Sequence, residues 1–315
     1  MKNFALTGVG GYIAPRHLQA IKETGNNLIA ALDPSDSVGI LDSFFDKVRF
    51  FTEFERFDRH CEKLRRKSED ERVHYVSICS PNFLHDAHIR FALRIGAHAI
   101  CEKPLVLNPW NIEPLREMEK ETGKKVNTIL QLRLHPAFAA LKKKLQEENS
   151  KNKHNICLTY VTSRGYWYNT SWKGNLERSG GLATNIGIHF FDLLIWLFGD
   201  VVHSEVHVAD PLKTGGFLEL EKANVKWFLS IDKSMLPSSA VNGKKTTFRS
   251  ITLNSEEIEF SEEFNDLHTA CYREILNGKG FGLEDSLPSI TLAHKIRNAE
   301  PEGVTSESHS FLLRK

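Results

Sequence analysis

The first part of the chain alternates short apolar runs with longer stretches of helical period. The apolar runs fall at residues 4–7, 28–32, 48–51, 73–79, 97–101 and 126–130. Short apolar runs bounded by turn residues predict buried strands, and strands that alternate with helices predict a doubly wound parallel sheet. We expect an α/β domain of this kind over residues 1–133.

The pattern changes from residue 134 onward. A helix is predicted at 136–148, and Val225, Trp227, Leu229 and Ile231 then alternate with mostly polar neighbours. Period-two alternation is typical of a half-buried strand. Similar runs lie at 156–162, 202–208, 216–220, 246–253 and 258–261. Strands with few helices between them predict an α+β domain with a largely antiparallel open sheet over residues 134–315.

Composition narrows the class of protein. Hydrophobic residues make up 41% and charged residues 26% of the 315 residues, with a net charge of +1. This balance gives no electrostatic footprint for nucleic acid or an anionic membrane. Five scattered cysteines favour reduced thiols over disulfides or a zinc site, so no metal is expected. The longest apolar run, 186–198, is too short to span a bilayer, and no secretory segment is visible, which predicts a cytoplasmic protein.

A glycine-rich turn follows the first predicted strand. Gly8-Val9-Gly10-Gly11-Tyr12-Ile13-Ala14 leads into a helix, the Rossmann arrangement in which backbone N–H groups at a helix N-terminus hold a pyrophosphate. The next strand ends at Asp33, the position of an acid that bonds the adenine ribose and repels a 2′-phosphate. NAD is therefore favoured over NADP. The alternatives are a plain glycine turn and an aspartate that only shapes a turn.

Polar residues follow the strand ends at the sheet edge where ligands bind. Glu102-Lys103-Pro104 follows the fifth apolar run, and proline ends a strand because it cannot donate to the ladder. Ser80, Pro81, Asn82, His85 and Gln131 lie just past other strands. The alternative for Glu102 and Lys103 is a solvated ion pair on a loop.

A second polar set lies within the predicted α+β domain. Asn185, His189 and Asp192 are spaced four and three residues apart in an otherwise apolar stretch that follows Gly180-Gly181. On a helix these three residues share one face. A cleft histidine and a satisfied core histidine are the two interpretations, and the neighbouring glycines and polar residues favour the cleft.

These motifs together resemble the Gfo/Idh/MocA family of NAD(P)-dependent sugar oxidoreductases. The resemblance rests on the glycine turn with Ala14, on Glu102-Lys103-Pro104 and on Gly-Gly-x-x-x-Asn-x-Gly-x-His-x-x-Asp, and it covers the whole chain. The segments 11–17, 101–111, 131–136 and 171–174 are similar to the family's UDP-N-acetylglucosaminuronic acid 3-dehydrogenases. That branch oxidises the sugar C3 hydroxyl on the way to the diamino uronic acid sugars of lipopolysaccharide. The resemblance implies NAD, a homotetramer, and 2-oxoglutarate as a reoxidant of NADH.

The resemblance also implies roles for individual residues. Lys103, Asn185 and His189 form the catalytic set. His189 is the preferred base because its ordinary pKa is about 6.5, although Asn185 stands where many members carry Asp, which leaves Lys103 open as the base. The expected substrate contacts are Lys103, Arg133, Arg164, Tyr168, Lys173, Asn185 and His189, with Arg178 a further cation. The expected NAD contacts are Gly8, Gly11, Tyr12, Ile13, Asp33, Ser80, Pro81, Asn82, His85, Glu102, Lys103, Gln131 and Trp172.

Two other functions remain open at this point. One is a dehydrogenase of a free sugar or inositol. Only the resemblance, and no physical feature of the residues, favours the UDP-sugar over these substrates. The other is a dinucleotide-sensing regulator without catalysis. The presence of Lys103 and His189, and the lack of an evident helix-turn-helix, argue against the regulator.

Overall fold

The computed structural model describes all residues except 149–151, 259, 261–265 and 315, and its chain divides into two compact units. Unit 1 consists of Met1–Leu134 and Asn265–Leu287. Unit 2 consists of His135–Phe264 and Pro288–Lys315. The domain boundary predicted at residue 134 assigns 265–287 to the second domain. These residues belong to unit 1 because the helix they form packs along a helix near the N-terminus.

Unit 1 contains a six-stranded parallel sheet of order β3-β2-β1-β4-β5-β6. The strands are β1 (Asn3–Thr7), β2 (Asn27–Leu32), β3 (Arg49–Phe51), β4 (Tyr75–Ile78), β5 (His98–Cys101) and β6 (Val126–Thr128). The strand order reverses between β1 and β4, which places the ligand-binding crevice of such sheets outside their carboxyl ends. The predicted doubly wound sheet is confirmed.

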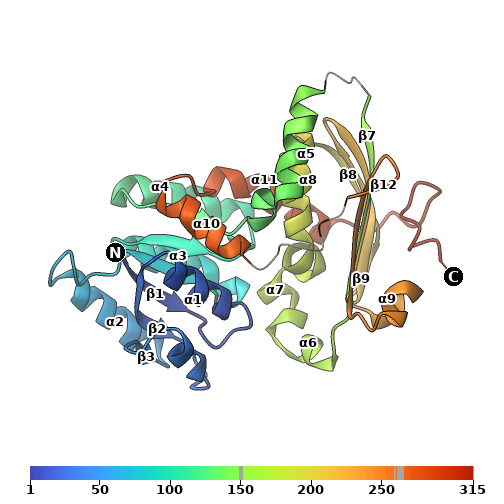
Figure 1. The fold of residues 1–315 in the computed structure, drawn as a ribbon. Coiled ribbons are helices and arrows are strands. Elements are labelled where there is room, and N and C mark those ends of the chain that lie inside the picture. The colour runs from blue at the N-terminus through green and yellow to red at the C-terminus, as the bar shows by residue number, and fades with distance from the viewer. Residues whose placement is uncertain (149–151, 259, 261–265, 315) are drawn as a thin grey trace. The chain divides into compact units, whose positions relative to one another are not determined.

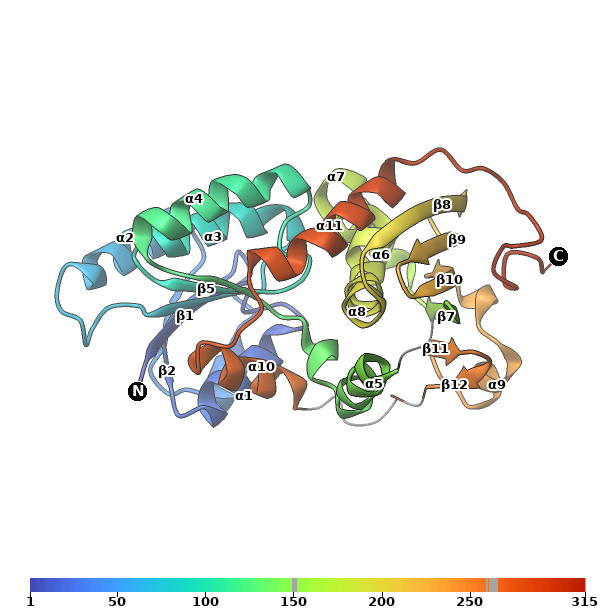
Figure 2. The same ribbon diagram turned by 90° about the horizontal axis from the view of Figure 1, so that it is seen from above.

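The main helices of unit 1 are α1 (Ala14–Glu23), α2 (Phe54–Arg65), α3 (His85–Arg94), α4 (Ile112–Thr122) and α10 (Leu267–Leu276). Short helical turns are η1 (Gly39–Ser43), η2 (Asn82–Leu84), η3 (Pro109–Asn111) and η4 (Gln131–Leu134). Figure 2 shows α2, α3 and α4 on one face of the sheet and α1 with α10 on the other. Between β2 and β3 the described helical structure is the short turn η1.

Unit 2 contains a second six-stranded sheet of order β12-β11-β7-β10-β9-β8. Its strands are β7 (His154–Thr162), β8 (Val201–Ala209), β9 (Lys213–Leu220), β10 (Ala223–Ser230), β11 (Thr247–Leu253) and β12 (Glu256–Glu257). All pairs are antiparallel except β7 with β10, so the largely antiparallel sheet is confirmed. The run expected at 258–261 is wrong for Ile258, which follows β12, and residues 259 and 261 lie outside the described part of the chain.

The helices of unit 2 are α5 (Pro136–Glu147), α6 (Tyr166–Thr170), α7 (Leu176–Ser179), α8 (Ile188–Phe198) and α9 (Ser238–Asn242). Between them lie η5 (Trp172–Gly174), the π-helical turn η6 (Ala183–Gly187) and η7 (Lys233–Met235). The last helix is α11 (Leu283–Asn298).

Both faces of the unit 2 sheet are covered. Val225, Trp227 and Leu229 of β10 are fully buried, as their alternation predicts. Phe228 is buried as well, because its ring packs against Phe311 of the C-terminal segment. Figure 1 shows that segment and α9 on the face opposite α5 and α8.

One helical stretch, Leu176–Phe198, is long and apolar enough to cross a membrane by length and composition alone. Its most apolar window is 67% buried within the structure. This is the behaviour of a core helix in a globular protein.

Candidate active site

The glycine turn after β1 is shaped for close approach of backbone to backbone. Gly8 has φ +81°, and a Cβ at this position would lie 2.5 Å from the carbonyl oxygen of Cys79. Only glycine fits both requirements. No side chain of the described residues caps the N-terminus of α1, where the N–H groups of Ala14 and Arg16 donate to the backbone carbonyls of Gly11 and Ile13. Such a helix end binds a phosphate.

Asp33 joins the end of β2 to this turn. Its Oδ2 accepts the Gly10 N–H at 2.9 Å, and its Oδ1 accepts the Ser35 N–H at 2.9 Å. The side chain therefore shapes a turn and also holds a carboxylate beside the glycines. This geometry fits both interpretations of Asp33, as a residue that shapes the turn and as an acid placed to bond the adenine ribose.

Gln131 supplies a further indication that a ligand binds at this edge. It opens η4, just past β6, and its Oε1 is buried with no hydrogen-bond partner among the described residues. A buried amide oxygen without a partner is costly, and a ligand N–H would satisfy it. With Gly8, the uncapped α1 and Asp33, the residues present fit a dinucleotide.

Other residues expected to contact the cofactor are held by the chain itself. His85 is 1% exposed, and its ring nitrogens lie 2.8 Å from Ser80 O and 2.7 Å from Pro104 O. Burial lowers the pKa of His85, while these carbonyls act in the opposite direction. The Ser80 hydroxyl lies 2.8 Å from Nδ1 of His88. His85 thus ties the loop after β4 to the loop after β5, which a cofactor contact does not require.

The remaining expected contacts differ in exposure. Tyr12 is 93% exposed, and Asn82 is buried in η2, which Pro81 precedes. Ile13 packs against the hydrophobic core of unit 1. These residues surround the glycine turn and the end of β4, and their contact with NAD stays a prediction.

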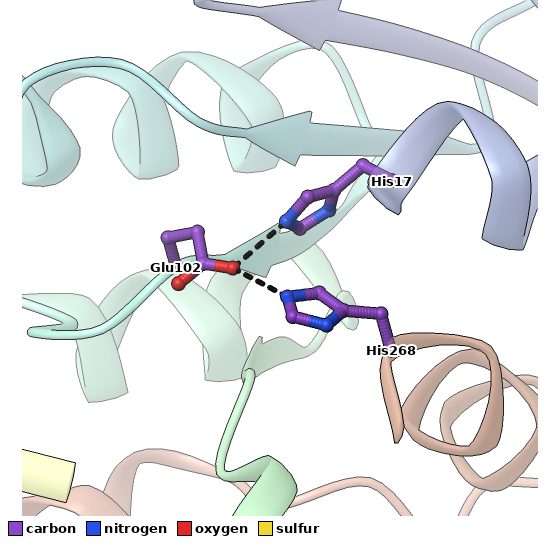
Figure 3. Close-up of side chains that lie close together, drawn as sticks. All are labelled: His17, Glu102 and His268. Carbon is purple, nitrogen blue, oxygen red and sulfur yellow. Dashed lines mark hydrogen bonds and ion pairs between the residues drawn. The ribbon is translucent and has the colours of Figure 1, made fainter. Parts of the chain in front are cut away.

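Glu102 and Lys103 follow β5 and have different surroundings. Glu102 is 6% exposed, and its Oε1 lies 2.9 Å from Nε2 of His17 and 3.0 Å from Nε2 of His268 (Figure 3). The alternative of a solvated Glu–Lys ion pair is therefore wrong. Lys103 is partly exposed at the carboxyl edge of the sheet, where the sequence places it.

Arg133 is occupied by a partner that the sequence analysis did not identify. Its guanidinium donates to Oδ1 and to the backbone oxygen of Asp285, at 3.0 and 2.9 Å, and stacks 5.1 Å from the ring centre of Phe281. The side chain is 8% exposed. A substrate anion would share this cation with Asp285, so the geometry gives Arg133 a structural role first.

In unit 2, Asn185 and His189 lie on one open face. From Leu182 to Ile195 only these two residues keep intermediate exposure, and all the others are buried. Asn185 belongs to the π-helical turn η6, and its amide donates to the Tyr168 hydroxyl at 2.7 Å. Asp192 is 3% exposed and lies inside the core. Asn185 and His189 thus keep the partial exposure that a binding face requires, while Asp192 is buried, and their contact with a substrate stays a prediction.

Two cations gather in the segment that joins β7 to α7. The Lys173 ammonium lies 4.2 Å from the ring centre of Trp172 and 5.7 Å from that of Trp167. Burial and then the charge of Arg164 lower the pKa of Lys173. No carboxylate of the described residues pairs with Lys173 or Arg164. Arg178 is exposed on α7.

Sequence reasoning missed His17, His268, Tyr272 and Asp285. His17 carried a signal, since it lies on the apolar stripe of α1 with Ala14, Leu18 and Ile21. His268, Tyr272 and Asp285 carried none, because their importance arises only when residues 265–287 fold onto unit 1.

Comparison with known proteins follows the same division of the chain. Residues 2–129 match the model for the oxidoreductase family with an NAD-binding Rossmann fold, named GFO_IDH_MocA. Residues 154–292 match the model for that family's C-terminal alpha/beta domain. Among curated proteins, D-glucoside 3-dehydrogenase of Escherichia coli is 32% identical over 135 residues, which is 39% of this chain and 35% of that enzyme.

The similarity to solved structures extends over the full length. The WlbA (WbpB) dehydrogenase of Thermus thermophilus, in complex with NAD and alpha-ketoglutarate, is 53% identical with a TM-score of 0.95, covering 99% of this chain and 100% of that one. The same enzyme with NAD and UDP-GlcNAcA gives a TM-score of 0.94 at 53% identity and the same coverage. The WlbA dehydrogenase of Bordetella pertussis shares the fold at 19% identity, with a TM-score of 0.77 over 96% of each chain. The Rossmann sheet, the two matched domains and the full-length likeness show that this chain belongs to the Gfo/Idh/MocA oxidoreductase family.

Proposed function

We propose that this protein is an NAD-dependent dehydrogenase that oxidises the C3 hydroxyl of UDP-N-acetylglucosaminuronate to the 3-keto sugar. The observation that carries the proposal is the 53% identity over the whole chain to a dehydrogenase crystallised with NAD and UDP-GlcNAcA. The uncapped helix beyond Gly8, Asp33 and the orphan amide of Gln131 support NAD as the cofactor.

The chain's own residues have two tasks in this reaction. NAD, when bound, supplies the acceptor for the hydride that leaves the sugar carbon. Lys103 holds the hydroxyl oxygen and stabilises the negative charge that develops there. His189 takes the hydroxyl proton as general base. Asn185 is oriented by its hydrogen bond to Tyr168, and its side-chain carbonyl oxygen offers an uncharged hydrogen-bond acceptor.

The substrate brings a diphosphate and a uronate carboxylate, which require cations. Arg164 and Lys173 are the best candidates for the diphosphate, since no acid of the described residues neutralises either one. Trp167 is 51% exposed and lies beside Lys173, so its indole offers a face on which a uracil ring stacks. Arg133 and Arg178 are the further candidates for the carboxylate, with Arg133 shared by Asp285.

The proposal extends to partners and setting. A relative crystallised with alpha-ketoglutarate supports 2-oxoglutarate as the oxidant that regenerates NAD. We place the enzyme in the cytoplasm, as a homotetramer, at the first oxidation on the way to diamino uronic acid sugars of lipopolysaccharide. The proposed cofactor contacts are Trp172 and the unit 1 residues expected to bind NAD, namely Gly8, Gly11, Tyr12, Ile13, Asp33, Ser80, Pro81, Asn82, His85, Glu102, Lys103 and Gln131.

The test is a product analysis of the purified protein. Incubation with UDP-N-acetylglucosaminuronate, NAD and 2-oxoglutarate is expected to yield the 3-keto nucleotide sugar and 2-hydroxyglutarate, both identified by mass spectrometry. scyllo-Inositol and a D-glucoside serve as comparison substrates, because dehydrogenases of both classes match this chain. Faster oxidation of either one would overturn the substrate assignment. Absence of any oxidation with NAD bound would favour a regulator.

A further inference from the structure

The carboxylate of Glu102 is buried but surrounded by N–H donors. Its Oε1 accepts from His17 and His268 at 2.9 and 3.0 Å (Figure 3). Its Oε2 accepts from the backbone N–H of Lys103 at 3.3 Å. A buried carboxylate is tolerated when charge-assisted hydrogen bonds replace its hydration. Burial alone would raise the pKa of Glu102, but the two histidine bonds outweigh it and hold that pKa well below the usual value.

The hydrogen bonds assign the protons of this cluster. In the neutral form of His17 whose Nε2 donates to Glu102, Nδ1 accepts from the Tyr272 hydroxyl at 2.7 Å, and that hydroxyl then accepts from Ser77 at 2.6 Å. Burial lowers the pKa of His17, which favours this neutral form. Nδ1 of His268 is buried without a partner in the described structure. Glu102 is therefore the acceptor on which the hydrogen bonds of both histidines converge.

The same three side chains are grouped closely enough to hold a metal ion. Around a tetrahedral zinc, ligand atoms at about 2.0 Å from the ion lie about 3.3 Å from one another. The two histidine nitrogens lie 2.9 and 3.0 Å from Oε1, which are ordinary hydrogen-bond lengths. The geometry favours the hydrogen-bonded cluster.

The cluster connects α1 and α10 to the loop that follows β5, where Lys103 lies. His17 belongs to α1, whose N-terminus meets the glycine turn, and His268 and Tyr272 lie one turn apart on α10. The rings of His268 and Tyr272 pack edge-on against His17 at 5.2 and 5.7 Å. On the other side of the lysine, His85 bonds the Pro104 carbonyl at 2.7 Å. The backbone is thus held on both sides of the Lys103 side chain. Glu102 bonds the Lys103 N–H, and His85 bonds the Pro104 carbonyl.

We propose that Glu102, fixed by His17 and His268, is a positioning residue that sets where the Lys103 ammonium lies, and that His17 couples this position to the helix facing the pyrophosphate. The inference rests on the proposed catalytic role of Lys103. None of the three residues needs to touch substrate or cofactor for this effect.

The first test compares two substitutions at one site. His268→Phe keeps a ring but removes the donor, and we expect kcat to fall about a hundredfold, the scale of a misplaced catalytic group, with the dissociation constant of NAD unchanged. His268→Gln keeps an N–H donor and is expected to restore most of the turnover. His98→Phe is the matched control and should behave as wild type. His98 begins strand β5, at the end opposite Glu102 and Lys103.

A pH profile separates positioning from mere support of the fold. In His268→Phe one donor to Glu102 is lost, so the carboxylate takes up a proton at higher pH. The acid limb of kcat should therefore move upward in this variant and stay in place in His98→Phe. Equal falls of kcat in the Phe and Gln variants, with an unmoved acid limb, would overturn the proposal.

Two measurements do not depend on turnover. Competitive acetylation of Lys103, read by mass spectrometry, should change rate in His268→Phe and in Glu102→Gln, which places an NH₂ against the Lys103 N–H. An altered labelling rate in a protein that oxidises no UDP-sugar would keep the positioning role and refute the proposed function. Unaltered labelling, or one equivalent of zinc per wild-type chain that His268→Phe loses, would overturn the positioning role.

Discussion

At the scale of single residues, a side chain's partners decide between interpretations that its sequence position leaves open. Glu102 and Arg133 both follow strand ends at the ligand edge, and both were expected to meet a ligand. The structure gives Glu102 two histidines and Arg133 an aspartate as internal partners. Asp33, in contrast, keeps the position beside the glycine turn that an acid recognising the ribose requires.

Asp33 provides the prediction on cofactor choice. Asp33→Asn keeps one acceptor for the Gly10 or Ser35 N–H and removes the negative charge. We expect the preference for NAD over NADP to fall roughly tenfold or more, since about 1.4 kcal/mol of repulsion toward a 2′-phosphate is relieved. Dissociation constants of both nucleotides, measured by calorimetry, check this. A preference equal to that of wild type would remove Asp33 from the ribose site.

Lys103 provides the prediction on catalysis. Lys103→Met keeps the length and apolar stem of the side chain but removes the ammonium. We expect turnover to fall roughly a hundredfold to a thousandfold, the loss seen when a group that stabilises an oxyanion is removed, while NAD binding survives. Rapid-mixing kinetics with UDP-N-acetylglucosaminuronate and NAD titration of the variant measure the two separately. Loss of both together would point to a structural lysine.

At the scale of elements, the segment between β7 and α8 contains most of the features of unit 2 that the proposed reaction would use. The π-helical turn η6 presents Asn185 while the residues around it stay buried, and such turns recur at functional sites. Helix α6 presents Tyr168 to that amide, and η5 presents Lys173 between two indoles. Exposed aromatic rings beside unneutralised cations are a surface suited to a nucleoside diphosphate.

The prediction at this scale concerns the two cations. Lys173→Gln and Arg164→Gln should each weaken UDP binding roughly tenfold or more, because a hydrogen bond to a charged group contributes about 1.5–3 kcal/mol. Inhibition by UDP and by UMP gives the measurement, and the loss should be larger for UDP. Lys222→Gln, an exposed cation between β9 and β10, is the control. Unchanged UDP affinity in both variants would assign the diphosphate elsewhere.

The sequence predicted the elements better than their connections. Six apolar runs were enough for the parallel sheet, since period and turn residues are local signals. Strand β10 was clear from Val225, Trp227 and Leu229, but the burial of Phe228 depends on Phe311, which is distant in sequence. Lys103 and His189 could be proposed from their motifs, because a motif is a local signal, whereas the partners of His268 and Asp285 are distant in sequence. These two residues acquire partners only because residues 266–287 pack within unit 1.

At the scale of the whole molecule, buried neutral histidines link stability to pH in both units. His88 in unit 1 is 6% exposed, and His309 in unit 2 is 1% exposed. Burial, followed by the nearby His85, lowers the pKa of His88 to about 4. Burial, followed by the charges of Arg314 and Lys226, lowers the pKa of His309 to about 4. In the unfolded chain both side chains bind a proton below about pH 6.5.

The free energy of unfolding should therefore be constant near neutral pH and fall as the pH drops from about 6.5 toward 4. Below pH 6.5 the unfolded state binds protons that these folded histidines exclude, and each one costs up to about 3 kcal/mol by pH 4. Urea unfolding at a series of pH values, followed by fluorescence and circular dichroism, gives the slope. His309→Phe should unfold with a shallower pH dependence, whereas His203→Gln, whose side chain is 54% exposed, should keep the wild-type slope. A free energy that stays level between pH 6.5 and 4.5 would show that these histidines take up protons without unfolding the chain.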